Sequence, residues 1–225
     1  MSAIGAEAPL TGPACPVQPE AHWQAVYQAK ASSELTWYQR EARASLEIIE
    51  RVLPERAAPI LDVGGGTSTL VDGLLDAGYR DVTILDVAPA ALAAVRARLG
   101  SRAELVRWLE ADVLRAELPE AGYALWHDRA LFHFLTEARD RRLYVEQARR
   151  ALRPRGFLLL AAFGEAGPSQ CSGLPVRRYR PETLHAEVGP EFSLLESVYE
   201  EHVTPRGRRQ PFVYCVFELR GLPRP

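Results

Sequence analysis

Three carboxylates each follow an apolar run in the first half of the chain, and glycines follow the first of them. Asp62 ends the run that begins at Ile60 and precedes glycines at 64–66, while Asp86 and Asp112 follow the next two runs. A carboxylate at a strand end must be solvated or paired, so packing explains three of them poorly. A glycine loop that opens a helix offers backbone N–H groups to a ligand, and a carboxylate accepts hydrogen bonds from ribose hydroxyls. This pattern predicts a site for a nucleotide-like ligand.

The spacing of the glycines bears on which nucleotide is bound. In the nicotinamide dinucleotide fingerprint, a third glycine follows the second by three residues, and a carboxylate about twenty residues further on binds the ribose. Gly64 and Gly66 fill the first two places, but Thr69 occupies the third, whereas Asp86 stands twenty residues after Gly66. An NAD-dependent oxidoreductase is therefore an alternative with an incomplete motif.

A second set of reactive side chains ends the apolar run at 122–126. Trp126, His127, Asp128 and Arg129 are consecutive, and His133 follows them. In a doubly wound sheet this strand lies beside the first one, so its end faces the ligand. His127 and Asp128 are predicted to be catalytic, because each can accept a proton from an incoming nucleophile. In the alternative interpretation, His127 is a buried structural residue and Asp128 caps the helix that follows.

The elements that must position these residues alternate between helix and strand. Periodicity and breaks at Pro and Gly predict helices at 20–30, 40–53, 68–77, 89–99, 138–152 and 181–188. Strands are predicted at 59–63, 82–86, 104–108, 122–126 and 157–163, with further β-like runs at 192–202 and 212–219. This alternation indicates an α/β fold with a parallel sheet covered by helices on both faces. A short loop joins the last two runs, so they must be antiparallel.

Composition excludes several classes of protein. The 225 residues are 47% hydrophobic with a net charge of −2, which suits one full core and gives no basic field for nucleic acid. Three separated cysteines without CxxC spacing indicate neither a disulfide framework nor a metal site. The longest apolar run, 157–163, is too short to cross a membrane. We expect a flexible tail at 1–19 and one domain at 20–225, with a helical lid at 20–54, in a cytoplasmic monomer or homodimer.

The segment from Asp62 to Ser68 resembles the first motif of the class I (seven-β-strand) S-adenosylmethionine-dependent methyltransferases, D/E-x-G-x-G-x-G, with Ser68 at the place of the third glycine. The resemblance covers residues 35–219. It implies a Rossmann-like, mostly parallel seven-stranded sheet with an antiparallel C-terminal strand. It also implies S-adenosyl-L-methionine as the cofactor and S-adenosyl-L-homocysteine as the product. The cofactor-binding residues that it implies are Asp62, Gly64, Gly65, Gly66, Ser68, Asp86, Val87, Asp112, Val113 and His127.

Two narrower resemblances leave the methyl acceptor open. Segments 22–27, 35–38, 125–130 and 212–217 look like those of small lysine methyltransferases. Segment 126–131 also resembles the W-D-R-G-A-L string of thiopurine and related thiol methyltransferases, with His127 inserted and the glycine absent. We expect transfer of a methyl group to an N, S or O nucleophile of a small molecule, and a protein lysine is the alternative. A non-catalytic module that binds the cofactor is a further alternative.

Aromatic residues before the first strand could close over the acceptor. Trp37 and Tyr38 lie between predicted helices and are expected to contact it, whereas Trp23 and Tyr27 share one helical face and are expected to pack on the sheet. Cys171 follows the run at 157–163 and is expected to be an ordinary loop cysteine. The residues predicted to bind the substrate are Trp37, Tyr38, Trp126, Arg129 and His133.

Overall fold

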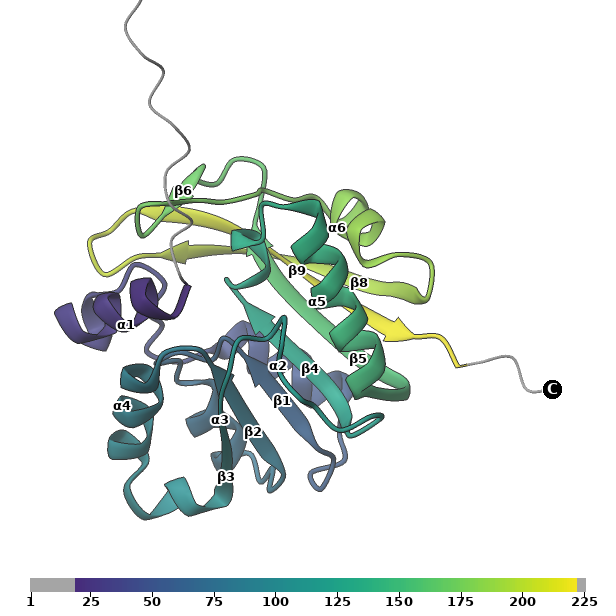
Figure 1. Cartoon of the computed structure of the whole chain (residues 1–225), viewed down its shortest axis with the longest axis horizontal. Coiled ribbons are helices and arrows are strands. Elements are labelled where there is room, and N and C mark those ends of the chain that lie inside the picture. Colours follow the sequence, from purple (N-terminus) through teal and green to yellow (C-terminus); the bar gives the residue numbers. More distant parts are fainter. Residues whose placement is uncertain (1–18, 222–225) are drawn as a thin grey trace, which may run out of the picture.

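A seven-stranded sheet in the order β3-β2-β1-β4-β5-β9-β8 forms the centre of the protein (Figure 1). The structure is a computed structural model that describes residues 19–221. The strands are β1 (Ile60–Val63), β2 (Val82–Asp86), β3 (Val106–Glu110), β4 (Tyr123–Arg129), β5 (Leu152–Phe163), β8 (Phe192–Val203) and β9 (Arg209–Leu219). Strands β1 to β5 are parallel, and β9 is antiparallel to both β5 and β8. This confirms the predicted α/β fold with a reversed strand near the C-terminus.

Helices cover both faces of the sheet, as predicted. Their bounds are α1 (Pro19–Ala29), α2 (Arg43–Val52), α3 (Leu70–Asp76), α4 (Pro89–Leu99), α5 (Ala138–Ala151) and α6 (Pro181–Val188). Short 3-10 helices lie at η1 (Ser32–Glu34), η2 (Gly100–Leu105) and η3 (Phe132–Phe134), and a small hairpin pairs β6 (Gln170–Cys171) with β7 (Leu174–Pro175). The hairpin was not predicted, because two-residue strands leave no periodic pattern in a sequence.

The core consists of two apolar layers, one on each face of the sheet. Helices α2, α3 and α4 pack into the layer that contains Ile60 and Ile84, while α5 and α6 pack into the layer that contains Leu61 and Leu85. Neighbouring strand residues thus belong to opposite layers, because side chains alternate across a strand. Every residue of β1 and β2 is buried, which is why these strands read as continuous apolar runs.

Helix α1 belongs to neither layer. None of its residues is fully buried, and it contacts α4, where the N–H of Ala90 donates to Oε1 of Gln24 at 2.9 Å. Figure 1 shows α1 beyond the end of α4, apart from the helices that cover the sheet. Residues 1–18, which hold nearly all of the predicted flexible tail, lie outside the described residues.

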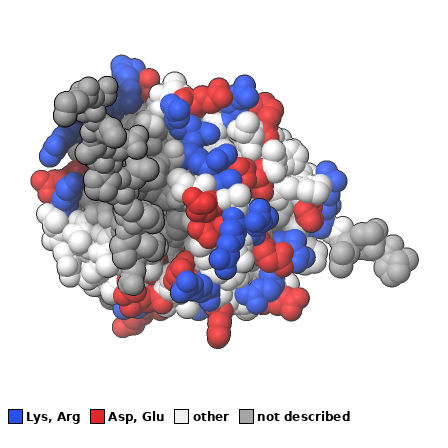
Figure 2. All heavy atoms as spheres, turned by 45° about the horizontal axis from the view of Figure 1, so that its top comes forward, with Lys and Arg blue, Asp and Glu red and all other residues white. Residues whose placement is uncertain are grey.

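The surface shows no concentration of one charge on the face drawn in Figure 2, where basic and acidic side chains are interspersed. Within the described residues, charged side chains form ion pairs such as Arg98 with Asp72 and Arg141 with Glu187. Within residues 19–221, no helix has the length and apolar character needed to cross a membrane.

Candidate active site

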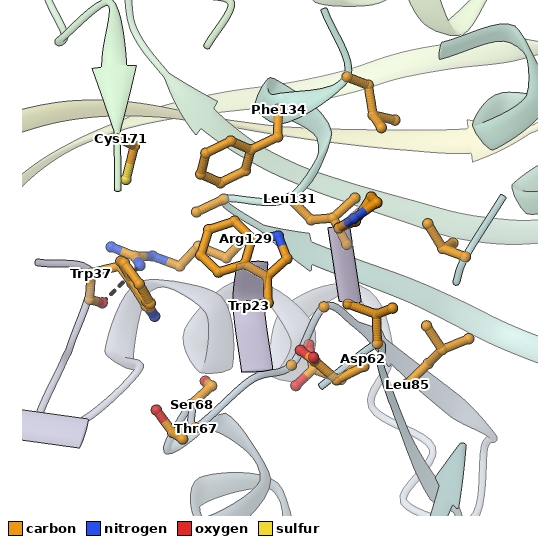
Figure 3. A pocket seen from close by; sticks show the side chains of 18 of the residues that line it. Trp23, Trp37, Asp62, Thr67, Ser68, Leu85, Arg129, Leu131, Phe134 and Cys171 are labelled. Carbon is orange, nitrogen blue, oxygen red and sulfur yellow. Dashed lines mark hydrogen bonds between the residues drawn. The ribbon is translucent and has the colours of Figure 1, made fainter. Parts of the chain in front are cut away.

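A pocket of about 360 Å³ opens at the carboxyl ends of β1, β2 and β4. Figure 3 shows Asp62, Ser68 and Leu85 at one end of it, which we call the glycine-loop end, and Cys171, Phe134 and Trp37 at the other. Ligands of open α/β sheets bind at this edge. Predicted site residues that line the pocket are Trp37, Tyr38, Asp62, Gly64, Gly65, Ser68, Asp86, Val87, Asp112, Val113, His127 and Arg129.

The glycine loop turns sharply out of β1. Gly64 and Gly66 have φ values of +62° and +52°, where L side chains are strained, and a Cβ on Gly64 would lie 2.5 Å from Leu131 Cδ1. The N–H of Leu70, the first residue of α3, donates to Ser68 Oγ at 3.1 Å, so Ser68 stabilises the start of the helix. Glycine is therefore required here by both backbone conformation and space.

Gly66 differs from the other loop residues, because it does not line the pocket. Its N–H donates to Oδ2 of Asp86 at 2.8 Å, and a Cβ on it would lie 2.3 Å from the hydroxyl of Tyr27. Tyr27 comes from α1 and lines the pocket. The side chain of Tyr27 therefore covers Gly66, which corrects the expectation that Tyr27 packs on the sheet.

Asp86 lies at the end of β2 with a buried carboxylate. Besides the bond from Gly66, its Oδ1 accepts the N–H of Ala88 at 2.8 Å. Burial raises the pKa of Asp86 to about 6, against the lowering effect of the backbone N–H groups of Ala88, Gly66 and Val87. Each oxygen can accept a further hydrogen bond, and Asp86 lines the pocket, so the carboxylate can accept the hydroxyls of a ribose.

Asp112 lies after β3 and lines the pocket beside Val113. Its Oδ1 accepts the N–H of Leu114 at 2.9 Å, which orders this turn, and its side chain is about one-third exposed. The three carboxylates at 62, 86 and 112 thus share one pocket, as the strand ends predict.

Asp62 is held by a chain of buried hydrogen bonds. Its Oδ1 lies 2.7 Å from Nδ1 of His127, and Nε2 of His127 lies 2.9 Å from Oγ of Ser45 on α2. All three side chains are buried. Both ring nitrogens of His127 are therefore engaged, and the predicted role of His127 in accepting a proton from a substrate is not supported by this arrangement. No sequence motif linked Ser45 to the site.

Side chains alternate along β4, so its last four residues point alternately to the two faces of the sheet. His127 and Arg129 face the pocket, whereas Trp126 and Asp128 point into the opposite core layer. Trp126 is fully buried, and its Nε1–H donates to the hydroxyl of Tyr144 on α5 at 2.8 Å. The prediction that Trp126 binds substrate is wrong, because the sheet separates it from the pocket.

Asp128 is a cap and not a catalytic base in this geometry. Its carboxylate accepts the N–H groups of Leu131 and Phe132 and the hydroxyl of Tyr144, the last at 2.6 Å. It is completely buried, and burial raises its pKa to about 6. The structure thus contradicts the prediction that Asp128 is catalytic, and it agrees with the alternative that Asp128 caps the segment that follows β4.

His133 also lies outside the pocket lining. It is fully buried and stacks on Phe163, with ring centroids 4.4 Å apart. Burial, with the nearby charge of Arg129, lowers the pKa of His133 to about 3, so the ring is neutral. The prediction that His133 binds substrate is therefore wrong, because its ring packs on Phe163 and does not line the pocket.

Arg129 links the pocket to the loop between α1 and α2. Its Nε donates to the hydroxyl of Tyr214 at 2.8 Å and its Nη1 to the carbonyl oxygen of Trp37 at 3.2 Å. Its Nη2 lies 3.6 Å from Oε2 of Glu200, and Figure 3 draws Arg129 beside the indole of Trp37. Arg129 therefore lines the pocket as predicted.

Aromatic rings form the other end of the pocket, which we call the aromatic end: Trp23, Trp37 and Phe134, together with Tyr27, which reaches from Trp37 to Gly66 at the glycine-loop end. Trp23 contacts Trp37 and Phe134 edge-on, at centroid distances of 5.8 and 4.9 Å. The structure thus places Trp23 at the pocket and not on the sheet, contrary to expectation. Cys171 and the hairpin residues Leu174 and Pro175 line the pocket as well.

Comparison with known proteins agrees with the site. Residues 60–156 match the family model of a methyltransferase domain. The eEF1A lysine and N-terminal methyltransferase of Mus musculus is 28% identical over 111 residues, which is 48% of this chain and 15% of that protein. The chain therefore spans a small part of the length of this curated relative.

Solved structures share the fold. A methyltransferase of Anabaena variabilis has a TM-score of 0.71 at 20% identity and covers 91% of this chain and 96% of its own. The 1,6-didemethyltoxoflavin-N1-methyltransferase of Burkholderia thailandensis has a TM-score of 0.67 at 22% identity. The alignment covers 95% of this chain and 94% of that one.

The residues at the glycine-loop end fit S-adenosylmethionine. Gly64 and Gly65 bring backbone without a side chain to the pocket, and the carboxylates of Asp62, Asp86 and Asp112 line it. Residues 60–156 thus match a methyltransferase domain, and the fold and the geometry of the site support a class I S-adenosylmethionine-dependent methyltransferase.

Proposed function

We propose that the protein transfers a methyl group from S-adenosylmethionine to an N, S or O nucleophile of a small molecule bound at the aromatic end of the pocket. The observation that carries this proposal is the aromatic lining that α1 and the following loop give to the pocket, through Trp23, Tyr27 and Trp37. A cavity with an aromatic lining suits a small apolar body with a few polar groups.

Methyl transfer from a sulfonium requires little acid–base chemistry. Bound S-adenosylmethionine supplies a methyl group that is already activated by the positive sulfur. The nucleophile's lone pair forms the new bond, and the electrons of the broken S–C bond remain on sulfur. The protein therefore has to hold the acceptor in line and at short distance. The buried capping role of Asp128 and the engagement of His127 are compatible with this mechanism.

The protonation state of the side chains at the aromatic end also suits an acceptor whose nucleophilic atom carries no proton when it binds. Burial raises the pKa of Tyr27 well above its ordinary value and raises that of the Cys171 thiol, so both groups are neutral at pH 7. Neither group is then a ready base for removing a proton. An aromatic nitrogen or an acidic thiol fits this environment.

A protein lysine is the second candidate. It is favoured by the similarity to proteins named eEF1A lysine and N-terminal methyltransferases, although this chain spans at most 31% of their length. The small-molecule candidate has the support of the neighbour named as a 1,6-didemethyltoxoflavin methyltransferase, which aligns with nearly the whole chain.

Transfer of label separates the two candidates. The protein is incubated with S-adenosylmethionine that carries a labelled methyl group and with a cell extract, and metabolites are then separated from proteins. We expect enzyme-dependent label in the metabolites. An Asp86→Ala variant, which should bind no cofactor, is the control for background transfer. Label found only in protein would contradict the small-molecule proposal.

A further inference from the structure

We propose that Arg98 is a positioning residue for the cofactor. From the last turn of α4 it holds the second half of the glycine loop, Thr67 and Ser68, in the shape that binds S-adenosylmethionine. Arg98 is not among the residues that line the pocket, so it acts through the loop and not by touching the cofactor. This inference goes beyond the proposed function, because it concerns the glycine-loop end and holds for either class of acceptor.

The first observation is that two different elements hold the two halves of the loop. Strand β2 holds the first half, where the N–H of Gly64 donates to the carbonyl oxygen of Leu85 at 2.7 Å. Arg98 holds the second half: its Nη1 donates to the carbonyl oxygen of Thr67 at 2.9 Å, and its Nη2 to that of Ser68 at 2.5 Å. The guanidinium fork thus fixes two successive peptide groups with charge-assisted hydrogen bonds.

The second observation is that these two carbonyl groups depend on Arg98. Within residues 19–221, neither carbonyl oxygen accepts a hydrogen bond from a backbone N–H. Thr67 is also buried, so little water reaches its backbone. A buried carbonyl group without a donor costs free energy, and a loop relieves that cost by changing its conformation. Removal of the guanidinium should therefore let the second half of the loop rearrange.

The third observation is that this half of the loop shapes the cofactor site. Thr67 and Ser68 both line the pocket, and Figure 3 shows their side chains together at the glycine-loop end. Ser68 also accepts the N–H of Leu70 at the start of α3. A change of conformation at these two residues would alter the pocket wall and the start of the helix together. A ligand binds tightly when the site already has its bound shape, so Arg98 should contribute to affinity.

A neighbouring arginine separates this role from ion pairing. Arg98 pairs with Asp72 at 2.8 Å, and Arg102 pairs with the same carboxylate at 3.5 Å and with Asp76 at 2.7 Å. The hydrogen bonds given for the described residues join Arg98, and not Arg102, to the glycine loop. Exposed ion pairs of this kind contribute little to stability. The contacts with the loop are therefore the feature that distinguishes Arg98.

Cofactor binding and hydrogen exchange test the inference. Arg98→Met removes the donors to the loop and keeps an apolar side chain of similar length. We expect the dissociation constant of S-adenosylhomocysteine, measured by calorimetry on the full chain, to rise about tenfold, as the loss of charge-assisted hydrogen bonds predicts. We also expect faster amide hydrogen exchange in segment 64–70 of the ligand-free variant, because the loop opens more often.

Two variants serve as matched controls. Arg102→Met removes an arginine from the same cluster, and Asp72→Asn removes the carboxylate that both arginines share. Both leave the bonds from Arg98 to the loop in place, so their affinity for S-adenosylhomocysteine should stay within about twofold of wild type, as expected for exposed ion pairs. Unfolding midpoints of all variants show whether any loss of affinity merely follows a loss of stability.

A second substitution applies if Arg98→Met does not fold. Arg98→Lys keeps the charge but not the fork that reaches two carbonyl groups, so we expect an intermediate rise of about threefold in the dissociation constant. Wild-type affinity in that variant would then overturn the inference. It would also be overturned if Arg98→Met binds within about twofold of wild type, or if Arg102→Met loses as much affinity. These outcomes do not involve the acceptor, so they are independent of the labelling result that tests the proposed function.

Discussion

His127 and Asp62 are directly paired across neighbouring strands, with Nδ1 of the imidazole 2.7 Å from Oδ1 of the carboxylate. A carboxylate partner favours the tautomer that carries its proton on Nδ1, which leaves Nε2 to accept the hydroxyl of Ser45. The imidazole is thus oriented from both sides. Its evident role is to position Asp62 beneath Gly65, where Oδ2 lies 2.9 Å from the place of a Cβ.

Replacing His127 tests this positioning role. His127→Phe leaves the buried carboxylate of Asp62 without its partner, so we expect a loss of about 3 kcal/mol in unfolding free energy and weaker binding of S-adenosylhomocysteine. Denaturant unfolding and calorimetry measure the two effects. His133→Phe is the matched control, because His133 is equally buried and neutral but has no carboxylate partner. Unchanged cofactor affinity in His127→Phe would contradict the role.

A methyl group on Gly66 should disturb the lid and the cofactor site together. In Gly66→Ala the Cβ meets the hydroxyl of Tyr27 at 2.3 Å and the backbone is strained at φ +52°. We expect the affinity for S-adenosylhomocysteine to fall by about tenfold or more, as Tyr27 and α1 are displaced.

Gly207→Ala is the control for strain alone, since Gly207 has φ +76° and no atom within 4 Å of the added Cβ. It should lose about 1 kcal/mol of stability and keep its cofactor affinity. If Gly66→Ala and Gly207→Ala bind S-adenosylhomocysteine equally well, the contact between the added Cβ at position 66 and Tyr27 does not affect cofactor binding.

We expect Asp128 and Tyr144 to contribute to the stability of the fold and not to methyl transfer. Tyr144→Phe removes the hydroxyl that donates to Asp128 and accepts from Trp126, so two buried groups lose a partner. We expect a loss of about 1–3 kcal/mol with unchanged cofactor affinity. Asp128→Asn should behave similarly, because an amide cannot replace all of the carboxylate's acceptor positions. A large loss of turnover in Asp128→Asn, with stability retained, would instead restore Asp128 as a catalytic base.

The affinity for cofactor should depend on pH through Asp86. Burial raises its pKa from 3.8 to about 6, so the folded protein binds a proton that the unfolded chain releases at lower pH. Ionised Asp86 therefore costs stability as pH rises from about 4 through 6, and this cost is complete above pH 6. The ionised form is, however, the one that accepts ribose hydroxyls.

We therefore expect S-adenosylhomocysteine to bind about tenfold more weakly at pH 5 than at pH 7. Calorimetry across this range measures the change, and Asp86→Asn, which does not titrate, should bind weakly with a flat profile. A wild-type profile that stays flat between pH 5 and 7 would show that another group binds the ribose.

Much of the fold could be predicted from local pattern. The strand ends at Asp62 and Asp86 are visible in the sequence, because strands buried on both faces form apolar runs, and these runs stop where the strands meet the pocket. The helix at 138–151 shows its apolar period in the same way. The three carboxylates then share one pocket by the geometry of parallel strands alone.

The roles of the residues on β4 needed the tertiary structure. A period of two in a fully buried strand does not say which set of residues faces the ligand, because both faces are covered by helices. Packing against Tyr144 of α5 turned Trp126 and Asp128 away from the pocket, and Ser45 of α2 met His127 on the other face. Contacts between residues so far apart in the chain leave no local pattern.

The amino-acid sequence by itself thus determined the sheet and the glycine loop with Asp62 and Asp86 beside it, because these depend on local periodicity and on the shared edge of parallel strands. Its resemblance to the class I methyltransferases indicated the cofactor. Only the tertiary structure decided that Trp23 and Tyr27 line the pocket and that Arg129 lies against Trp37 at its edge. Those relationships depend on how α1 docks against α4 and on which face of β4 each helix covers, and both are decided by packing between distant segments.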